Sequence, residues 1–280
     1  MKSIYWQLLS AVILIAYTLH WSQVVPLGGD EKIYLISSAL IDDDININEE
    51  HPPLVKRFYN LLLTPEYKHE IVIDETLRTR LLWIPNSYAT DYQRDLLLAG
   101  GRYLRLINGL LISAFLLYVW WRSKSFMLFL SLFATLMLSD ELFSCLLDGW
   151  LFVGAVGGYY LLSVGNPVGW VFSLVLGPLA KINGFVLSLF SLFDHPKSAK
   201  QFGAVCALLA FTIIVFWGAQ SIGYGARHFW MQFSANNTAT KAPDWPGISG
   251  LFQMRYITPF IGILMVKYWN KDSARACPSG

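Results

Sequence analysis

The chain has few charged residues and few cysteines for its length. Only 14% of its 280 residues are charged and 55% are hydrophobic, whereas a soluble domain of average composition carries about 25% charged residues. The three cysteines, Cys145, Cys206 and Cys277, give no disulfide framework. A net charge of +2 is too small to indicate a nucleic-acid partner. This composition is typical of a protein that has lipid as its solvent.

The sequence also lacks internal repeats and low-complexity tracts, and its few acidic residues are unevenly placed. Of the 19 aspartates and glutamates, 13 fall between Asp30 and Asp95. One acidic, solvated segment is thereby separated from a long apolar remainder. We expect a single membrane domain over residues 1–280, with a large polar loop at about 22–101 and a second one at about 221–255.

Apolar stretches predict an all-α polytopic membrane protein, because about 20 mostly apolar residues are needed to cross the hydrocarbon core. Pro167–Phe193 is too long for one simple span and is interrupted near Lys181, so we expect two short helices there. With these two, the bundle has about eight transmembrane helices. A cleaved signal peptide is the alternative for the first stretch, but no A-x-A-like site precedes the loop. The other six helices are expected at about 4–21, 103–121, 126–138, 142–163, 202–220 and 256–269.

Lysines and arginines in short loops favour the cytoplasmic side of a membrane. If the N-terminus is inside, eight helices place both polar loops outside the membrane. A single span over 167–193 would instead place Lys197 and Lys200 outside, against this charge rule. We therefore expect an extracytoplasmic face that carries both polar loops. Short loops and the absence of retention signals favour a bacterial inner (plasma) membrane, with the ER membrane as the eukaryotic equivalent.

Two groups of candidate residues lie in the first loop. Asp30 and Glu31 are adjacent carboxylates with Tyr34 close by, and such a pair can act as a general base or bind a cation. The alternative is a solvated turn. His51 precedes two prolines and an amphipathic run that could lie flat in the interface, although a polar residue before a turn is the simpler interpretation of His51. The apolar face of this run comprises Leu54, Phe58, Leu61 and Leu62.

Further candidates lie at helix junctions that are expected to face outside. Arg102 stands at the start of the second helix, where snorkelling arginines are common. Asp140 and Glu141 form a second acidic pair. Lys181 is expected at membrane depth, where an ionisable residue is costly and indicates function, and Arg255 stands at the start of the last helix. A reaction that removes a group from a lipid phosphate needs such a set, in which a carboxylate deprotonates the acceptor and cations stabilise the departing phosphate.

In their order, these motifs resemble those of the GT-C membrane glycosyltransferases, in the branch of the protein O-mannosyltransferases and lipid A aminoarabinose transferases. The resemblance runs from about residue 4 to about residue 265, although glycine replaces the usual alanine before Arg102. Members of the family are usually longer and have more helices. The matching elements are Asp30-Glu31 with Tyr34, His51-Pro52-Pro53-Leu54, Gly101-Arg102-Tyr103-Leu104, Leu179-Ala180-Lys181-Ile182-Asn183-Gly184 and Arg255-Tyr256-Ile257-Thr258-Pro259.

The resemblance implies that a sugar is transferred, with inversion, from a polyprenyl-phosphate donor to a glycan, lipid or protein acceptor outside the membrane. It also implies a GT-C-like bundle whose first loop carries helices along the membrane. Asp30 would be the base, with Glu31 as its neighbour. Lys181 and Arg255 would face the lipid phosphate, with Arg102 as a secondary candidate, and His51 would shape a substrate pocket.

The sequence identifies no definite cofactor, and a divalent cation is one option. Asp42, Asp43 and Asp44 could bind a divalent cation, and a solvated loop is the alternative for this triplet. A non-catalytic protein that binds a lipid-linked glycan, either as a flippase or as a subunit of a complex, is the competing interpretation of the chain. A secondary transporter is disfavoured because the two halves show neither repeats nor matched broken helices.

Overall fold

The computed structural model describes residues 2–24, 29–40, 53–74, 77, 90–137, 148–180, 183–196, 198–212, 214 and 254–276. Over these residues the regular structure is helical and contains no strand, which confirms the all-α class. The expected candidates His51, Asp140, Glu141 and Lys181 lie outside the described residues, as does the triplet at 42–44. The chain divides into two compact units.

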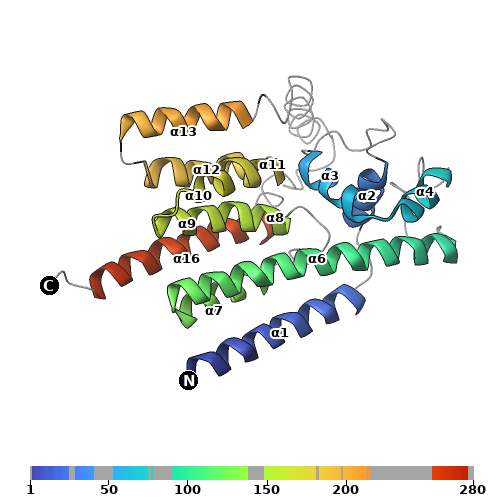
Figure 1. Ribbon diagram of the computed structural model, residues 1–280, viewed down its shortest axis with the longest axis horizontal. Helices are drawn as coiled ribbons and strands as arrows, with labels where there is room; N and C mark the ends of the chain where they lie inside the picture. The colour runs from blue at the N-terminus through green and yellow to red at the C-terminus, as the bar shows by residue number, and fades with distance from the viewer. Residues whose placement is uncertain are drawn as a thin grey trace, which may run out of the picture. The chain divides into compact units, whose positions relative to one another are not determined.

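The first unit is built around the longest helix. It contains α1 (Lys2–Val24), α2 (Gly29–Ala39), α3 (Pro53–Leu62), α4 (Pro65–Ile73) and α6 (Asp91–Ser123). Helices α2, α3 and α4 lie along the N-terminal half of α6, and α1 lies on the opposite side of α6 (Figure 1). A helix is present at the expected 4–21, and the described residues of the expected polar loop include α2, α3, α4 and the first turns of α6.

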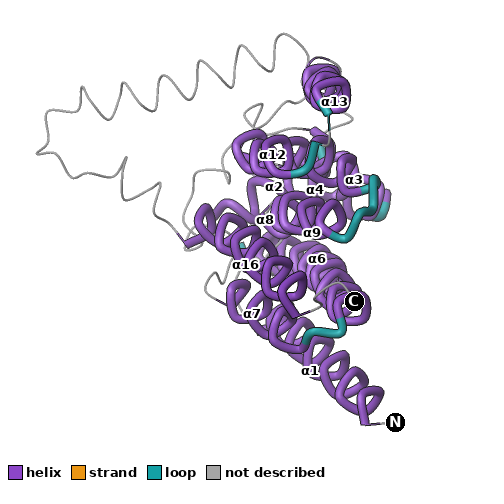
Figure 2. Tube along the Cα trace, turned by 90° about the vertical axis from the view of Figure 1, so that its left-hand side faces the viewer, coloured by secondary structure: helices purple, strands orange, loops and turns teal. Residues whose placement is uncertain are grey.

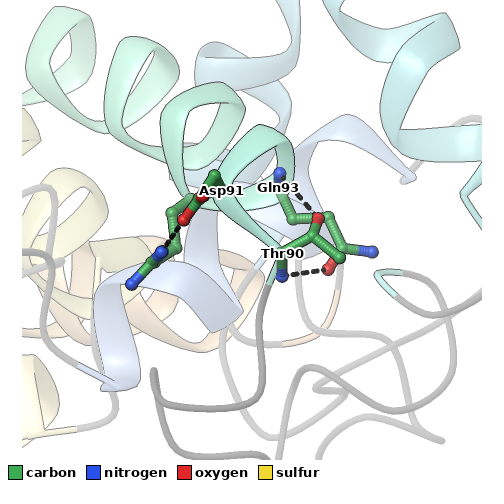
Figure 3. Close-up of polar contacts among 4 residues, drawn as sticks. Thr90, Asp91 and Gln93 are labelled. Atoms are coloured by element: carbon green, nitrogen blue, oxygen red, sulfur yellow. Dashed lines mark hydrogen bonds and ion pairs between the residues drawn. The ribbon is translucent and has the colours of Figure 1, made fainter.

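Helix α6 begins about a dozen residues before the expected position near residue 103. Its start is fixed by a reciprocal capping box, in which Thr90 Oγ1 accepts from the N–H of Gln93 at 3.2 Å and Gln93 Oε1 accepts from the N–H of Thr90 at 3.1 Å (Figure 3). Asp91 lies in the first turn, where the helix dipole favours an acidic residue. Hydropathy placed the start too late because this first part of the helix is polar.

Helix α1 packs on α6 through a narrow stripe of mainly small polar residues. Its buried residues Ser10, Leu14, Thr18 and Ser22 recur every four positions, so they form one helical face. Thr18 Oγ1 lies 3.5 Å from Ser113 Oγ. A side chain at Gly109 would collide with Thr18, so this glycine is what lets the two helices approach closely.

The rest of α1 exposes large apolar side chains. They belong to Tyr5, Trp6, Leu8, Leu9, Val12, Ile13, Ile15 and Leu19, which are between 40% and 68% exposed. Single exposed apolar residues are ordinary in soluble proteins, but a contiguous apolar surface of this kind marks a contact with lipid or with another protein.

The second unit is a stack of helices. Its longer helices are α7 (Phe126–Met137), α12 (Asn183–Asp194), α13 (Ala199–Thr212) and α16 (Met254–Ala276). Between α7 and α12 come shorter segments, two of them π-helical: α8 (Asp148–Phe152), the π-helix η4 (Val153–Gly157), α9 (Gly158–Ser163), α10 (Gly169–Val171), the π-helix η5 (Phe172–Leu176) and α11 (Gly177–Ala180). From one side to the other, the layers follow the order α13, α12, α9, α16 and α7 (Figures 1 and 2).

The turn between α9 and α10 follows from one glycine. Gly165 has a φ of 80°, which a residue without Cβ adopts without strain. The N–H of Gly165 bonds the carbonyl of Leu162 at 2.9 Å and the N–H of Asn166 bonds that of Leu161 at 2.8 Å. This is the Schellman pattern, in which two carbonyls that the helix end leaves free are satisfied and the chain reverses.

The interruption expected in Pro167–Phe193 is confirmed, because α12 packs back against η5 and α11, which one continuous helix could not do. A side chain at Gly184 would collide with the carbonyl of Gly177, so glycine is needed for this close approach. The hydroxyl of Ser188 donates to the carbonyl of Ser173 at 2.5 Å, which holds the two segments together.

The number of membrane spans remains a prediction. Within the described residues, α6 is the one helix that is both long and apolar enough to cross a membrane, and 56% of its most apolar window is buried. Helices α7 and α16 occur where they were expected, at 126–138 and 256–269, although α16 continues to Ala276. Shorter apolar helical stretches cover Leu8–His20, Phe126–Leu136, Gly169–Ala180, Lys200–Thr212 and Ile257–Trp269.

Candidate functional site

A buried ion pair joins α2 to α6 in the first unit. Arg105 Nε donates to Glu31 Oε1 at 2.7 Å, and a second guanidinium nitrogen of Arg105 contacts Glu31 Oε2. Arg105 is 2% exposed and Glu31 is 4% exposed. Two charges withdrawn from water need this paired, two-point geometry, because either one alone would be strongly destabilising in that position. The pair therefore fixes the start of α2 against α6.

The acidic pair occupies the first turn of α2. Gly29 begins the helix, so the backbone places Asp30 and Glu31 where the helix dipole stabilises negative charge. Tyr34 follows Glu31 by three residues, which puts both on one side of the helix, and Tyr34 is buried. The side chain of Asp30 lies outside the part of the chain that the structure describes.

Lys32 is a buried cation beside the acidic pair. Its side chain is 7% exposed, and this burial lowers the pKa of its ammonium group. Among the described residues, the ammonium makes neither a hydrogen bond nor an ion pair. Sequence reasoning assigned Lys32 no role, and burial is the signal that distinguishes it from an ordinary surface lysine.

Polar contacts hold α3 against α6 and α2. The Tyr59 hydroxyl donates to Asn108 Oδ1 of α6 at 2.7 Å, and Asn60 Nδ2 donates to the carbonyl of Ser38 at the end of α2 at 2.9 Å. Lys68 of α4 donates to Asn60 Oδ1 at 3.3 Å. Since Tyr59 and Asn108 are fully buried, these contacts define the positions of α2, α3 and α4 on α6.

The amphipathic character expected for α3 is confirmed, and the structure separates its two faces. Val55, Tyr59 and Leu63 pack inward, whereas Leu61 is 81% exposed. Phe58 is half-buried. Of the predicted apolar face, Leu61 thus faces outward, and Leu62 is half-buried like Phe58.

Helix α4 is held to the start of α6 by two side-chain bonds. The Tyr92 hydroxyl donates to Glu70 Oε2 at 2.6 Å, and Gln93 Nε2 donates to Asp74 Oδ2 at 2.8 Å. These four residues belong to the acidic segment that sequence reasoning assigned to solvent. They account for much of why that segment folds as helices against α6.

Arg102 lies in an open groove between α1 and α6. The groove has a volume of about 550 Å³ and is lined by Leu19, Ser22, Gln23, Arg102, Tyr103 and Leu106. Arg102 is exposed, and no carboxylate pairs with it among the described residues. Sequence reasoning chose Arg102 as a site residue and passed over Arg105, which is one turn further on. Spacing alone does not tell which of the two faces α2.

The predicted site is only partly assembled from described residues. Glu31 and Tyr34 lie in the site on α2, and the backbone of Asp30 starts that helix. The backbone of Arg255 is in the first turn of α16, in the second unit, and its side chain is not described. The convergence of Lys181 and Arg255 on the first loop therefore stays a prediction. No group of three or more His, Cys, Asp or Glu suited to a metal ion occurs among the described residues.

A second polar cluster joins three helices of the second unit. The carboxylate of Asp194 on α12 accepts from the Tyr159 hydroxyl of α9 at 2.7 Å and from Lys267 Nζ of α16 at 2.6 Å. The His195 ring lies edge-on to the Tyr159 ring, with centroids 4.6 Å apart. Sequence reasoning gave these residues no shared role, since 35 and 73 positions separate Asp194 from its two partners.

Charge and burial shift the two acid-base groups of this cluster. Burial opposes the ionised form of Asp194, but the hydrogen bonds from Lys267 and Tyr159 outweigh it and hold the pKa of the carboxyl below its ordinary value. Burial lowers the pKa of His195, with Asp194 opposing that shift and Lys267 adding to it. The cluster thus carries an ionised carboxylate beside a neutral imidazole at neutral pH.

No protein-family model matches this chain, and neither a curated protein nor a solved structure was found to match it.

Proposed function

We propose that this protein is a membrane-embedded, inverting glycosyltransferase that moves a sugar from a polyprenyl-phosphate donor to an acceptor on the extracytoplasmic face. The observation that carries the proposal is the acidic start of α2, where Glu31 is locked by Arg105 next to Asp30 and the buried Lys32. The ordered motifs that resemble GT-C transferases supply the reaction class.

Placement in a membrane is supported by how the helices pack. Helix α1 exposes apolar side chains from Tyr5 to Leu19, which in water would be costly. Where helices touch, small residues allow close approach, as Gly109 does against Thr18 and Gly184 does against Gly177. Small residues at helix contacts and apolar residues facing outward are typical of helices packed in lipid.

Serine and threonine hydroxyls support the same placement. Thr135 donates to the carbonyl of Ser131 at 2.6 Å, Thr212 to that of Leu208 at 2.9 Å, and Ser163 to that of Tyr159 at 2.9 Å. Each bond runs back four residues along its own helix, so the hydroxyl needs no water. A helix in hydrocarbon has to satisfy its polar groups internally in this way.

The proposed step is a single displacement at the anomeric carbon of the donor sugar. The Asp30 carboxylate takes the proton of the acceptor hydroxyl as its oxygen forms the new glycosidic bond. The bond from the anomeric carbon to the phosphate oxygen breaks at the opposite face, and polyprenyl phosphate leaves with the electron pair. Attack opposite to the leaving group inverts the anomeric centre.

The neighbouring charges have separate tasks. Glu31, neutralised by Arg105, acts as a positioning residue that orients the first turn of α2. Lys32 is the described cation closest in sequence to Asp30, and we assign it to the charge that grows on the departing phosphate. The resemblance implies that Lys181 and Arg255 would also face the lipid phosphate.

The proposal is tested by a screen of purified protein against polyprenyl-phosphate sugars with mass-spectrometric detection of the product. We expect one donor to yield a glycosylated acceptor and free polyprenyl phosphate in equal amounts. Binding of a lipid-linked sugar without any acceptor-dependent release of polyprenyl phosphate would instead identify the non-catalytic alternative.

A further inference from the structure

One ring nitrogen of His195 is buried without a hydrogen-bond partner among the described residues. The residue directly follows α12, in the polar cluster that joins α12 to α9 and α16, and the unpaired atom is its Nε2. The carboxylate of Asp194 beside it accepts hydrogen bonds from both Tyr159 and Lys267. Packing against Tyr159, and not a hydrogen bond to a described residue, therefore holds the imidazole in a costly position.

The groups that act on this imidazole come from three helices, each of which contacts the other two (Figure 1). Asp194 of α12 favours a positive charge on His195, whereas burial and Lys267 of α16 oppose it. Tyr159 of α9 contributes the neighbouring ring, and α13 contributes Lys200, whose side chain is exposed. The junction accommodates a neutral imidazole, because its carboxylate is already paired with Lys267.

A proton taken up by His195 would disturb this junction in two ways. Both ring nitrogens of an imidazolium are donors, so the buried Nε2 would carry an N–H group without an acceptor among the described residues. The new charge would also compete with Lys267 for Asp194. Rotation of the ring into solvent relieves both effects, and it breaks the ring contact with Tyr159.

We propose that His195 is a proton-operated clasp, which holds the end of α12 against α9 while the imidazole is neutral and releases it when the imidazole is protonated. The charge of histidine changes between about pH 5 and pH 8, which suits this role. Asp194 stays ionised in that range, because its pKa lies below 3.8, so its bond to Lys267 keeps α12 on α16 during release. The clasp does not depend on the proposed transfer chemistry.

Acidification should favour the released state. Burial holds the pKa of the docked His195 below the ordinary 6.5, so a released, solvated imidazole takes up its proton at a higher pH than the docked one. The docked state is therefore fully favoured above pH 6.5 and loses stability relative to the released state as the pH falls below that value.

Hydrogen exchange of the full-length protein in detergent, measured by mass spectrometry, tests the clasp. Peptides from α9 and from the end of α12 are compared at about pH 7 and about pH 5, after correction for the intrinsic pH dependence of exchange. We expect wild type to exchange several-fold faster in both peptides at the lower pH. His195→Gln and His195→Phe lack an ionisable ring, and the second keeps an aromatic contact with Tyr159, so both variants should lose the pH response whatever their basal exchange.

Two further variants separate the clasp from a general effect of acid. His69→Gln removes an exposed histidine on α4, in the first unit, and should keep the wild-type response. Lys267→Met removes the cation that opposes protonation and frees Asp194 to pair with the imidazolium, so its response should be smaller than that of wild type.

Three results would overturn the inference. The first is wild-type exchange in α9 and α12 that does not respond to pH. The second is a response that persists undiminished in both His195→Gln and His195→Phe, since acid would then act through another group. The third is a response that is lost in His69→Gln. A failed screen for sugar transfer would contradict the proposed function and leave the clasp standing.

Discussion

Arg105 Nε lies 2.7 Å from Glu31 Oε1, although 74 residues separate the two in the chain. The contact brings the acidic start of α2 onto the middle of the longest helix, in a place where both side chains are buried. The positions of Asp30 and Lys32 follow from it, because both belong to the same turn of α2 as Glu31.

Removing one partner of this pair should strongly destabilise the first unit. We expect Arg105→Met or Glu31→Gln to lower the free energy of unfolding by about 3–5 kcal/mol, because the remaining group stays buried without its partner. Unfolding of the purified protein in detergent measures the effect. The double variant should lose less than the sum of the two single variants, and Arg94→Met, at an exposed pair, should change stability by less than about 0.5 kcal/mol. Additive losses would show that the pair is not coupled.

Lys32 should reduce stability while supporting activity. At neutral pH a charged group is held in a buried position, so Lys32→Met should raise the free energy of unfolding by on the order of 1 kcal/mol. The same variant should lower the transfer rate roughly a hundredfold if the ammonium faces the departing phosphate. Lys68→Met, which loses a hydrogen bond to Asn60, should be less stable than wild type. A destabilised Lys32→Met protein would contradict the assignment.

The destabilising effect of Lys32 should also depend on pH. Because its pKa is lowered in the folded protein, the unfolded chain binds more protons between that lowered value and the ordinary 10.5. The stability of wild type relative to Lys32→Met should therefore rise as the pH rises toward 10.5. Unfolding measured in parallel for the two proteins at alkaline pH tests this, and a difference that stays constant would count against burial of the charge.

Asp194 should stabilise the contact between α12 and α16 at pH values where its carboxyl group is ionised, and not at pH values where it is protonated. Its pKa is lower in the folded protein than the ordinary 3.8, so the contribution is complete above that value and is lost as the pH falls through the folded pKa. We expect Asp194→Asn to cost about 1 kcal/mol or less near neutral pH, because both partners are partly exposed. The free energies of unfolding of wild type and Asp194→Asn should differ at neutral pH and become equal in acid. A gap that persists in acid would rule out this titration.

The close contact at Gly184 gives a prediction on packing. Gly184→Ala should destabilise the second unit by about 1–3 kcal/mol, because the added methyl collides with the backbone at Gly177. Gly203→Ala is the matched control, since nothing lies within 4 Å of that position and alanine favours a helix. Thermal unfolding should therefore separate the two variants in opposite directions, and equal behaviour would contradict the close approach.

Hydropathy and helix-breaking residues predicted the apolar helices well, as α1, α7 and the reversal of the chain between η5 and α12 illustrate. The early start of α6 was not predicted, because its cause is the capping pair Thr90 and Gln93 together with contacts from α4, which hydropathy does not measure. In the site, the acidic pair stood out in the sequence. The partner of Glu31 did not, because two arginines one turn apart look alike until their faces are known.

The most direct test of the account is acceptor-dependent release of polyprenyl phosphate by purified wild-type protein and by Asp30→Asn. The substitution keeps the size of the side chain and removes the base, so we expect the variant to insert and unfold like wild type while transfer is lost. Full activity in Asp30→Asn would contradict the central claim that the acidic start of α2 performs the chemistry.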